Sequence, residues 1–246
     1  MILSRITRAI REQNWFAVLL EFVIVIAGVV IGFQVTAWNA ERAASETEQI
    51  YLARLFDDAE RSFCHIGQEE RSITNWNERA RRTLDALLSN DPEAATDTGF
   101  ELVAALRVST GSPYRATLNE LVNGGQMNLI SNENLRAEIA AADARLASLS
   151  EYIQILVTAQ TSYSWSVHSR LRPIPGQVYG VVYDFEALAD DDEFINALGQ
   201  ALRIQHANIS WLGEMVEVVE ELRLTIGAEI GRDVSTEPNC SAFEAQ

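Results

Sequence analysis

One long apolar segment near the N-terminus constrains this chain more than any other feature. From Trp15 to Trp38 the sequence reads WFAVLLEFVIVIAGVVIGFQVTAW, and Glu21 is the only charged residue in it. An α-helix of this length spans roughly 36 Å, enough to cross the hydrocarbon of a bilayer with modest tilt. Soluble helices rarely stay apolar on every face over such a length. The segment therefore predicts a transmembrane helix rather than a buried core helix.

The flanking residues predict the orientation of this helix. Arg5, Arg8 and Arg11 precede the segment, and basic residues mark the cytoplasmic end of a membrane helix. Trp15 and Trp38 stand at its two ends, where an indole ring can lie in lipid with its N–H in water. We therefore expect a protein of the bacterial inner membrane, with a cytoplasmic N-terminus and a periplasmic C-terminal domain.

A cleaved signal peptide is the alternative, with Val35-Thr36-Ala37 as a small-residue cleavage site. The apolar stretch exceeds an ordinary signal core, which favours an uncleaved anchor. The expected organisation is a basic tail over 1–14, a transmembrane helix over 15–38, a periplasmic domain over 39–232 and a polar tail over 233–246. With a net charge of −16, the chain does not attract nucleic acid.

Five residues share one side of the expected transmembrane helix. At 100° per residue, Gly28 and Gly32 each lie about 20° from Glu21 around the axis, and Val25 and Val35 continue the stripe. A GxxxG pair lets two helices approach closely, and an intramembrane carboxylate is costly unless it faces protein or water. The stripe predicts contact with another membrane protein or with a second copy. Alternatively, Glu21 reaches the cytoplasmic interface and the glycines have no role.

Beyond Trp38 the apolar residues recur at three- and four-residue steps, which is typical of amphipathic helices. The sequence predicts an all-α fold, in which the transmembrane helix runs into an antiparallel helical bundle. The first expected helix ends at Asn90-Asp91-Pro92, and a short second helix covers about 100–108. A third runs from a Ser112 cap to Asn123-Gly124-Gly125, and a fourth runs from a Ser131 cap to about Leu171. The last begins at Asp190-Asp191-Asp192.

Residues 173–189 lack helical spacing and contain proline, glycine and three aromatic residues. A short hairpin or an extended loop is expected there. Tyr179, Tyr183 and Phe185 either pack as a cap over one end of the bundle or form a docking loop for a partner.

The chain has two cysteines, Cys64 in the first external helix and Cys240 in the polar tail. Outside the cytoplasm an even number of cysteines favours a disulfide. Such a bridge would enclose about 175 residues and contribute at most roughly 5 kcal/mol in the chain-entropy model. The alternative is a buried Cys64 with a free, exposed Cys240.

No motif for catalysis, metal or cofactor binding is present. His65, His168 and His206 are scattered, without a second ligand at metal-binding spacing. The acids at 190–192 are expected to cap a helix rather than bind a metal. We therefore expect no enzyme activity, no metal and no cofactor.

Two stretches resemble a family of uncharacterised bacterial single-pass membrane proteins. The first comprises Glu21, Gly28, Gln34 and Trp38-Asn39, followed by Glu41-Arg42. The second runs from Leu121 to Asn132, LVNGGQMNLISN, with Leu135-Arg136. The resemblance implies a glutamate-containing membrane helix and a helical external domain, and it brings no assigned reaction.

Three functions remain open at this point. The first is an accessory or assembly subunit of a larger membrane complex, docked through the Glu21 stripe. The second is an extracytoplasmic sensor that binds a ligand between helices and acts through a partner. The third is a stator-like subunit in which Glu21 carries protons.

Overall fold

Most of the chain is helical. The computed structural model describes residues 15–95, 99–232, 234, 238 and 240–242. The helices are α2 (Trp15–Ser89), α3 (Phe100–Ala104), α4 (Ala116–Asn123), η1 (Met127–Leu129), α5 (Glu133–His168), α6 (Phe185–Ala189), α7 (Asp192–Glu229) and η2 (Cys240–Ala242), and the strands are β1 (Arg172–Pro173) and β2 (Val181–Val182). The predicted fold class is confirmed.

The chain divides into two compact units, residues 1–50 and 51–246. The boundary between the units lies within α2. The helix continues through this boundary because no proline or glycine occurs between Gly32 and Gly67. Leu52 is the first fully buried apolar residue. The second unit therefore begins where residues of α2 become buried. The expected division into a membrane helix that ends at Trp38 and an external domain over 39–232 stays a prediction.

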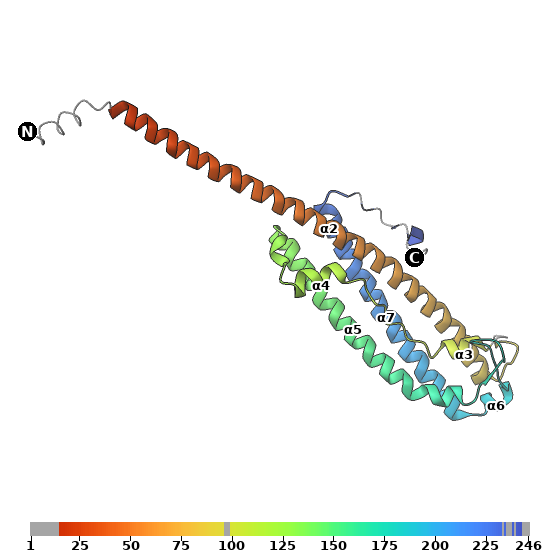
Figure 1. The fold of residues 1–246 in the computed structure, drawn as a ribbon. Helices are drawn as coiled ribbons and strands as arrows, with labels where there is room; N and C mark the ends of the chain where they lie inside the picture. The colour runs from red at the N-terminus through yellow and green to blue at the C-terminus, as the bar shows by residue number, and fades with distance from the viewer. Residues whose placement is uncertain (1–14, 96–98, 233, 235–237, 239, 243–246) are drawn as a thin grey trace, which may run out of the picture. The chain divides into compact units, whose positions relative to one another are not determined.

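Three long helices form the second unit: the part of α2 beyond residue 50, α5 and α7. Figure 1 shows α5 and α7 running side by side, with α3 and α6 at one end of the bundle and α4 at the other. Two clusters of buried apolar residues follow this arrangement. One cluster lies under α4 and includes Ile66, Ile139 and Leu212. The other lies at the end of the bundle that carries α3 and α6, and it includes Phe194 and Leu198.

The segment that joins α3 to α4 runs along the bundle in Figure 1 without helical structure of its own. Its backbone groups therefore need partners from side chains. Buried amides supply them. Asn208 donates to the Ser109 carbonyl at 2.9 Å and accepts from the Ser109 amide at 2.9 Å. Gln205 donates to the carbonyls of Ala104 and Arg107, at 2.9 and 3.1 Å, and Gln160 donates to that of Ala105 at 2.8 Å.

Gly111 fits this segment tightly against α7. Its φ is +56°, and a Cβ there would collide with the side chain of Leu212. Glycine tolerates positive φ without a steric cost. The segment can therefore turn while lying against the helix.

Two of the predicted helix caps are wrong. α5 is capped by Asn132, one residue after Ser131, because the Asn132 side chain accepts from the amides of Asn134 and Leu135. The Ser112-Pro113 pair does not open α4, which begins at Ala116. The Asp58 carboxylate, on α2, instead accepts from the Thr117 amide at 3.0 Å. The predicted acidic start of α7 is correct: Asp191 accepts from the Phe194 amide at 2.9 Å.

The segment after α5 is a hairpin, one of the two expected forms. α5 ends at His168, three residues before the expected end, and β1 pairs with β2 in antiparallel register, Arg172 opposite Val182. The sequence did not predict α6. That helix has five residues, too few to show a periodicity, and its start is fixed by the Asp184 carboxylate, which accepts from the Ala187 amide.

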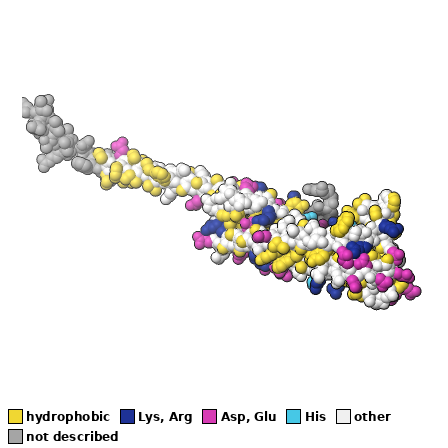
Figure 2. Space-filling model, turned by 90° about the horizontal axis from the view of Figure 1, so that it is seen from below, with side chains coloured by type: hydrophobic (Ala, Val, Ile, Leu, Met, Phe, Trp, Pro, Cys, Tyr) yellow, Lys and Arg dark blue, Asp and Glu magenta, His cyan; other side chains and the backbone are white. Residues whose placement is uncertain are grey.

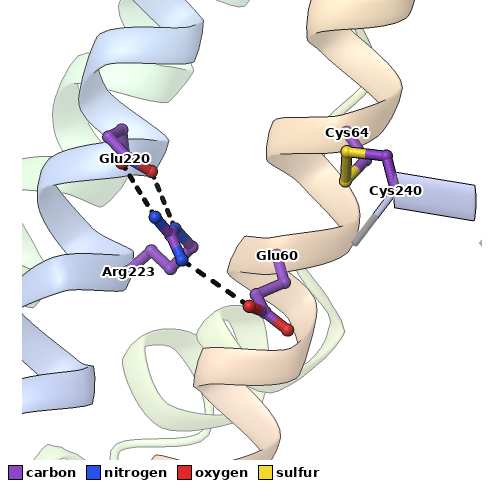
Figure 3. The surroundings of a disulfide bond; sticks show 5 residues. All are labelled: Glu60, Cys64, Glu220, Arg223 and Cys240. Carbon is purple, nitrogen blue, oxygen red and sulfur yellow. Dashed lines mark hydrogen bonds and ion pairs between the residues drawn. A yellow bond between two sulfur atoms is a disulfide. The ribbon is translucent and has the colours of Figure 1, made fainter. Parts of the chain in front are cut away.

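A disulfide joins Cys64 on α2 to Cys240 in the polar tail, as the cysteine count favoured (Figure 3). Other contacts hold the same part of the chain against the bundle. Arg232 pairs with Asp57 at 2.9 Å, and Val234 lies where a Cβ on Gly227 would collide with it. The tail predicted at 233–246 is therefore attached to the second unit at the residues described.

A buried ion pair lies near the disulfide and joins α7 to α2 (Figure 3). The Arg223 guanidinium is fully buried and donates to both carboxylate oxygens of Glu220, at 2.7 and 2.8 Å. It also lies 3.6 Å from a carboxylate oxygen of Glu60. The hydrogen bonds that Arg223 donates to Glu220 raise the pKa of Arg223. A buried charge is tolerated when it is paired in this way.

The first prediction concerns the buried amides. Replacing Gln205 by leucine keeps the size of the side chain and removes its hydrogen bonds to two backbone carbonyls and to the Asn77 amide. We expect the Gln205→Leu variant to lose roughly 2–4 kcal/mol of unfolding free energy, measured by urea denaturation. Gln154→Leu, at an exposed position on α5, is the matched control. Equal stability of the two variants would contradict this role for Gln205.

The second prediction concerns the disulfide. Its loop closes over a sequence separation of 176 residues, so breaking it enlarges the unfolded ensemble. We expect the Cys64→Ser, Cys240→Ser double variant to unfold with about 2–5 kcal/mol less free energy than the parent chain. A reducing agent should destabilise the parent chain and leave the double variant unchanged. A parent chain that is insensitive to reduction would show that the bridge carries no stability.

Candidate functional site

The candidate site is the N-terminal part of α2, which belongs to the first unit. Every described side chain from Val18 to Glu46 is exposed, including apolar residues as large as Phe22 and Phe33. Figure 2 shows yellow apolar side chains over this part of the helix. In the described chain, α2 is the one helix long and apolar enough to cross a membrane. Side chains of this kind are normally removed from water.

Continuous helical structure places the predicted stripe on one side of α2. Val25 and Val35 are 59% and 50% exposed. A Cβ added at Gly28 or at Gly32 would meet no atom within 4 Å. Nothing in the described chain therefore covers this side, and there is open space beside both glycines.

Two polar groups interrupt the apolar surface. The Thr36 hydroxyl donates to the Gly32 carbonyl at 2.9 Å, so the helix itself satisfies it. Glu21 differs, since no hydrogen bond or ion pair joins its carboxylate to the described residues. A carboxylate within an apolar span needs water, a cation or a hydrogen-bond donor from outside the helix.

The residues predicted to mark the membrane interfaces are only partly described. Trp38 is 61% exposed on α2, and its place at a membrane interface stays a prediction. Arg5, Arg8 and Arg11 lie outside the described residues, as does the side chain of Trp15. Their part in orientation stays a prediction.

The structure separates the three aromatic residues of the predicted docking loop. Tyr183 and Phe185 are half-buried and pack against the apolar cluster at the end of α3 and α6, which is the packing expected of a cap. Tyr179 is 51% exposed and contacts the ring of Phe100 edge-on, with centroids 6.0 Å apart. Most of this set is therefore part of the bundle, and Tyr179 alone presents a large surface to solvent.

Two charged clusters were not predicted from the sequence. Arg170, at the end of α5, donates to Asp191 and to Glu193, both at 2.9 Å. These hydrogen bonds lower the pKa values of both carboxyl groups. The partners are more than 20 residues apart, so local spacing gives no signal for the pair. They fix the end of α5 to the beginning of α7.

The other cluster joins α2 to α4. The Tyr51 hydroxyl donates to Glu120 at 2.5 Å, and Arg54 donates to the other oxygen of Glu120 at 2.8 Å. The hydrogen bond from Tyr51, followed by that from Arg54, lowers the pKa of Glu120. The same bond raises the pKa of the Tyr51 hydroxyl. These groups are held by one another and serve to attach α4.

The bundle has shallow clefts but no metal cluster among the described residues. One cleft of about 680 Å³ lies beside the hairpin and is lined by Arg170, Arg172, Tyr183 and Asp191, among others. Arg170 is already neutralised there by two carboxylates. A smaller cleft of about 350 Å³ lies between α5 and α7, where Arg145 pairs with Glu221 at 3.1 Å.

Comparison with known proteins gives no match. No protein-family model fits the sequence, and no similar curated protein or solved structure is found. The resemblance to single-pass membrane proteins is therefore supported only in its coarse form, a long apolar N-terminal helix followed by a helical domain.

Proposed function

We propose that this chain is a non-catalytic accessory or assembly subunit of a larger membrane complex, docked on its partner through the helix at 15–38. One observation carries the proposal. Glu21, Gly28 and Gly32 lie on one side of an apolar helix, and no described part of the chain covers that side.

Protein is a better neighbour for this side of the helix than lipid. A carboxylate in hydrocarbon costs several kcal/mol, whereas a partner helix can supply a cation or a hydrogen-bond donor. At Gly28 and Gly32 the absence of side chains brings the two backbones close, which increases the van der Waals contact that drives helix association in a bilayer.

The proposed location is the bacterial inner membrane, with the bundle in the periplasm. The apolar helix and the basic residues before it support this topology. The disulfide supports it independently, because such bonds persist in oxidising compartments and are rare in the cytoplasm. The bundle would then lie beside the external part of the partner as a rigid body. The disulfide and the buried Arg223 ion pair would stabilise it by joining α2 to the C-terminal tail and to α7.

The third prediction tests the docking face. Isoleucine at both glycines prevents close approach of a partner helix, so the Gly28→Ile, Gly32→Ile double variant should lose co-purification of its partners from gently solubilised membranes. Val23→Ile with Val30→Ile adds bulk to the opposite side of the helix and should retain them. Equal recovery of partners with both double variants would remove the docking face.

The fourth prediction separates docking from proton transfer at Glu21. Glutamine keeps the shape and hydrogen-bonding capacity of the side chain but cannot titrate. If Glu21 serves assembly, the Glu21→Gln variant should co-purify with its partners and leave the activity of the complex unchanged, whereas Glu21→Leu should weaken assembly. Normal assembly with lost activity in Glu21→Gln would instead favour the stator-like function.

A further inference from the structure

A second interaction surface lies on the bundle, along the C-terminal half of α5. Residues 152–169 contain no Asp, Glu or Arg, the longest such run beyond residue 50 in a chain of net charge −16. Surface helices normally carry charges on their outer side. Here the outer side carries Ile155, 59% exposed, and Trp165, 78% exposed.

Helical geometry brings the exposed residues of this run onto one side. Ile155, Thr158, Ser162 and Trp165 follow one another at three- and four-residue steps and are all exposed. The Thr158 hydroxyl donates to the Gln154 carbonyl of the same helix at 3.0 Å, so it needs no water. We call these four residues the neutral face of α5.

Aromatic packing continues the neutral face toward α7. The ring of Tyr152 is 47% exposed and stacks on Trp211, with centroids 5.0 Å apart. Aromatic residues are enriched, and charged residues depleted, in the cores of protein interfaces. The two aromatic rings and the lack of charged residues on this surface agree with that pattern.

We propose that the neutral face binds a second copy of this chain. In a two-fold contact the same patch lies on both sides, so a patch rich in Asp and Glu would bring acids close to acids. Two chains of net charge −16 repel over most of their surfaces, and this is the long stretch of helix where that repulsion is absent. A different partner would instead gain from charges complementary to the acidic surface.

The size of the neutral face sets the strength of this contact. From Ile155 to Trp165 the helix rises about 15 Å, and a helix is about 10 Å wide, so each copy buries on the order of 150–300 Å² there, with Tyr152 included. A stable soluble dimer needs roughly 800 Å² per partner. The contact therefore depends on confinement in one membrane, which raises the effective concentration, and in this respect it rests on the proposed anchor.

Cysteine cross-linking in intact cells tests the contact. Ile155→Cys, Thr158→Cys and Ser162→Cys each add one thiol, and a bismaleimide reacts with that thiol alone because Cys64 and Cys240 are paired. We expect covalent dimers from at least one of these variants, about tenfold above the control Gln68→Cys, which is exposed on α2. Yields no higher than the control at all three positions would overturn the proposal.

A second substitution tests the chemistry of the face. In the Ser162→Cys background, Trp165→Glu adds an acid to both sides of the contact between chains that are already acidic and should reduce the dimer yield, whereas Trp165→Phe should preserve it. An unchanged yield with Trp165→Glu would count against a symmetric contact. If cross-linking fails while partners still co-purify, this inference is overturned and the docking proposal remains. If co-purification is lost while the cross-linked dimers still form, the docking proposal is overturned and this inference remains.

Discussion

The structure depends on the constraint that apolar surface must leave water and that buried polar groups must find partners. The two units meet this constraint in different ways. The second unit encloses its apolar stripes between α2, α5 and α7. The N-terminal part of α2 has no such neighbours in the described chain, and its side chains stay exposed from Val18 onward. Its environment therefore comes from outside the described residues, and the bilayer and partner helix that we propose would supply the apolar and the polar part of it.

Within the bundle, polar side chains also connect segments that are far apart in the sequence. The segment between α3 and α4 is not part of a helix or sheet. The side-chain amides of Gln160, Gln205 and Asn208 donate hydrogen bonds to backbone carbonyls of residues 104–109. The Arg223 pair and the disulfide connect α2 with α7 and the C-terminal tail. These attachments come from side chains that are far apart in the sequence, and they make the bundle a defined body rather than three loosely packed helices.

The sequence predicted the long elements well because their signals are local. The apolar periodicity gave α2, α5 and α7, and the Asn90-Asp91-Pro92 stop agrees with the end of α2 at Ser89. The failures have non-local causes. α4 begins at Ala116 because Asp58, on α2, accepts from the Thr117 amide, and no sequence window contains both residues. The amides that hold the segment at 104–109 come from α5 and α7 and carry no motif.

The residues of the Glu21 stripe could be predicted from the sequence, whereas the neutral face of α5 could not. Glu21, Gly28 and Gly32 follow from helical spacing alone, since the helix is regular there. The neutral face of α5 also leaves a trace in the sequence, as a run without charged residues, but its meaning depends on which residues are exposed. Ile153 and Gln160 lie in the same run and are buried, so the run alone cannot identify the surface.

Photo-cross-linking from within the apolar helix is the most direct measurement of the central claim. A photoreactive residue at Val25, on the Glu21 side, should form discrete adducts with protein in native membranes, whereas the same residue at Val30, on the opposite side, should label mainly lipid. Labelling of lipid alone from both positions would contradict a helix that docks on protein.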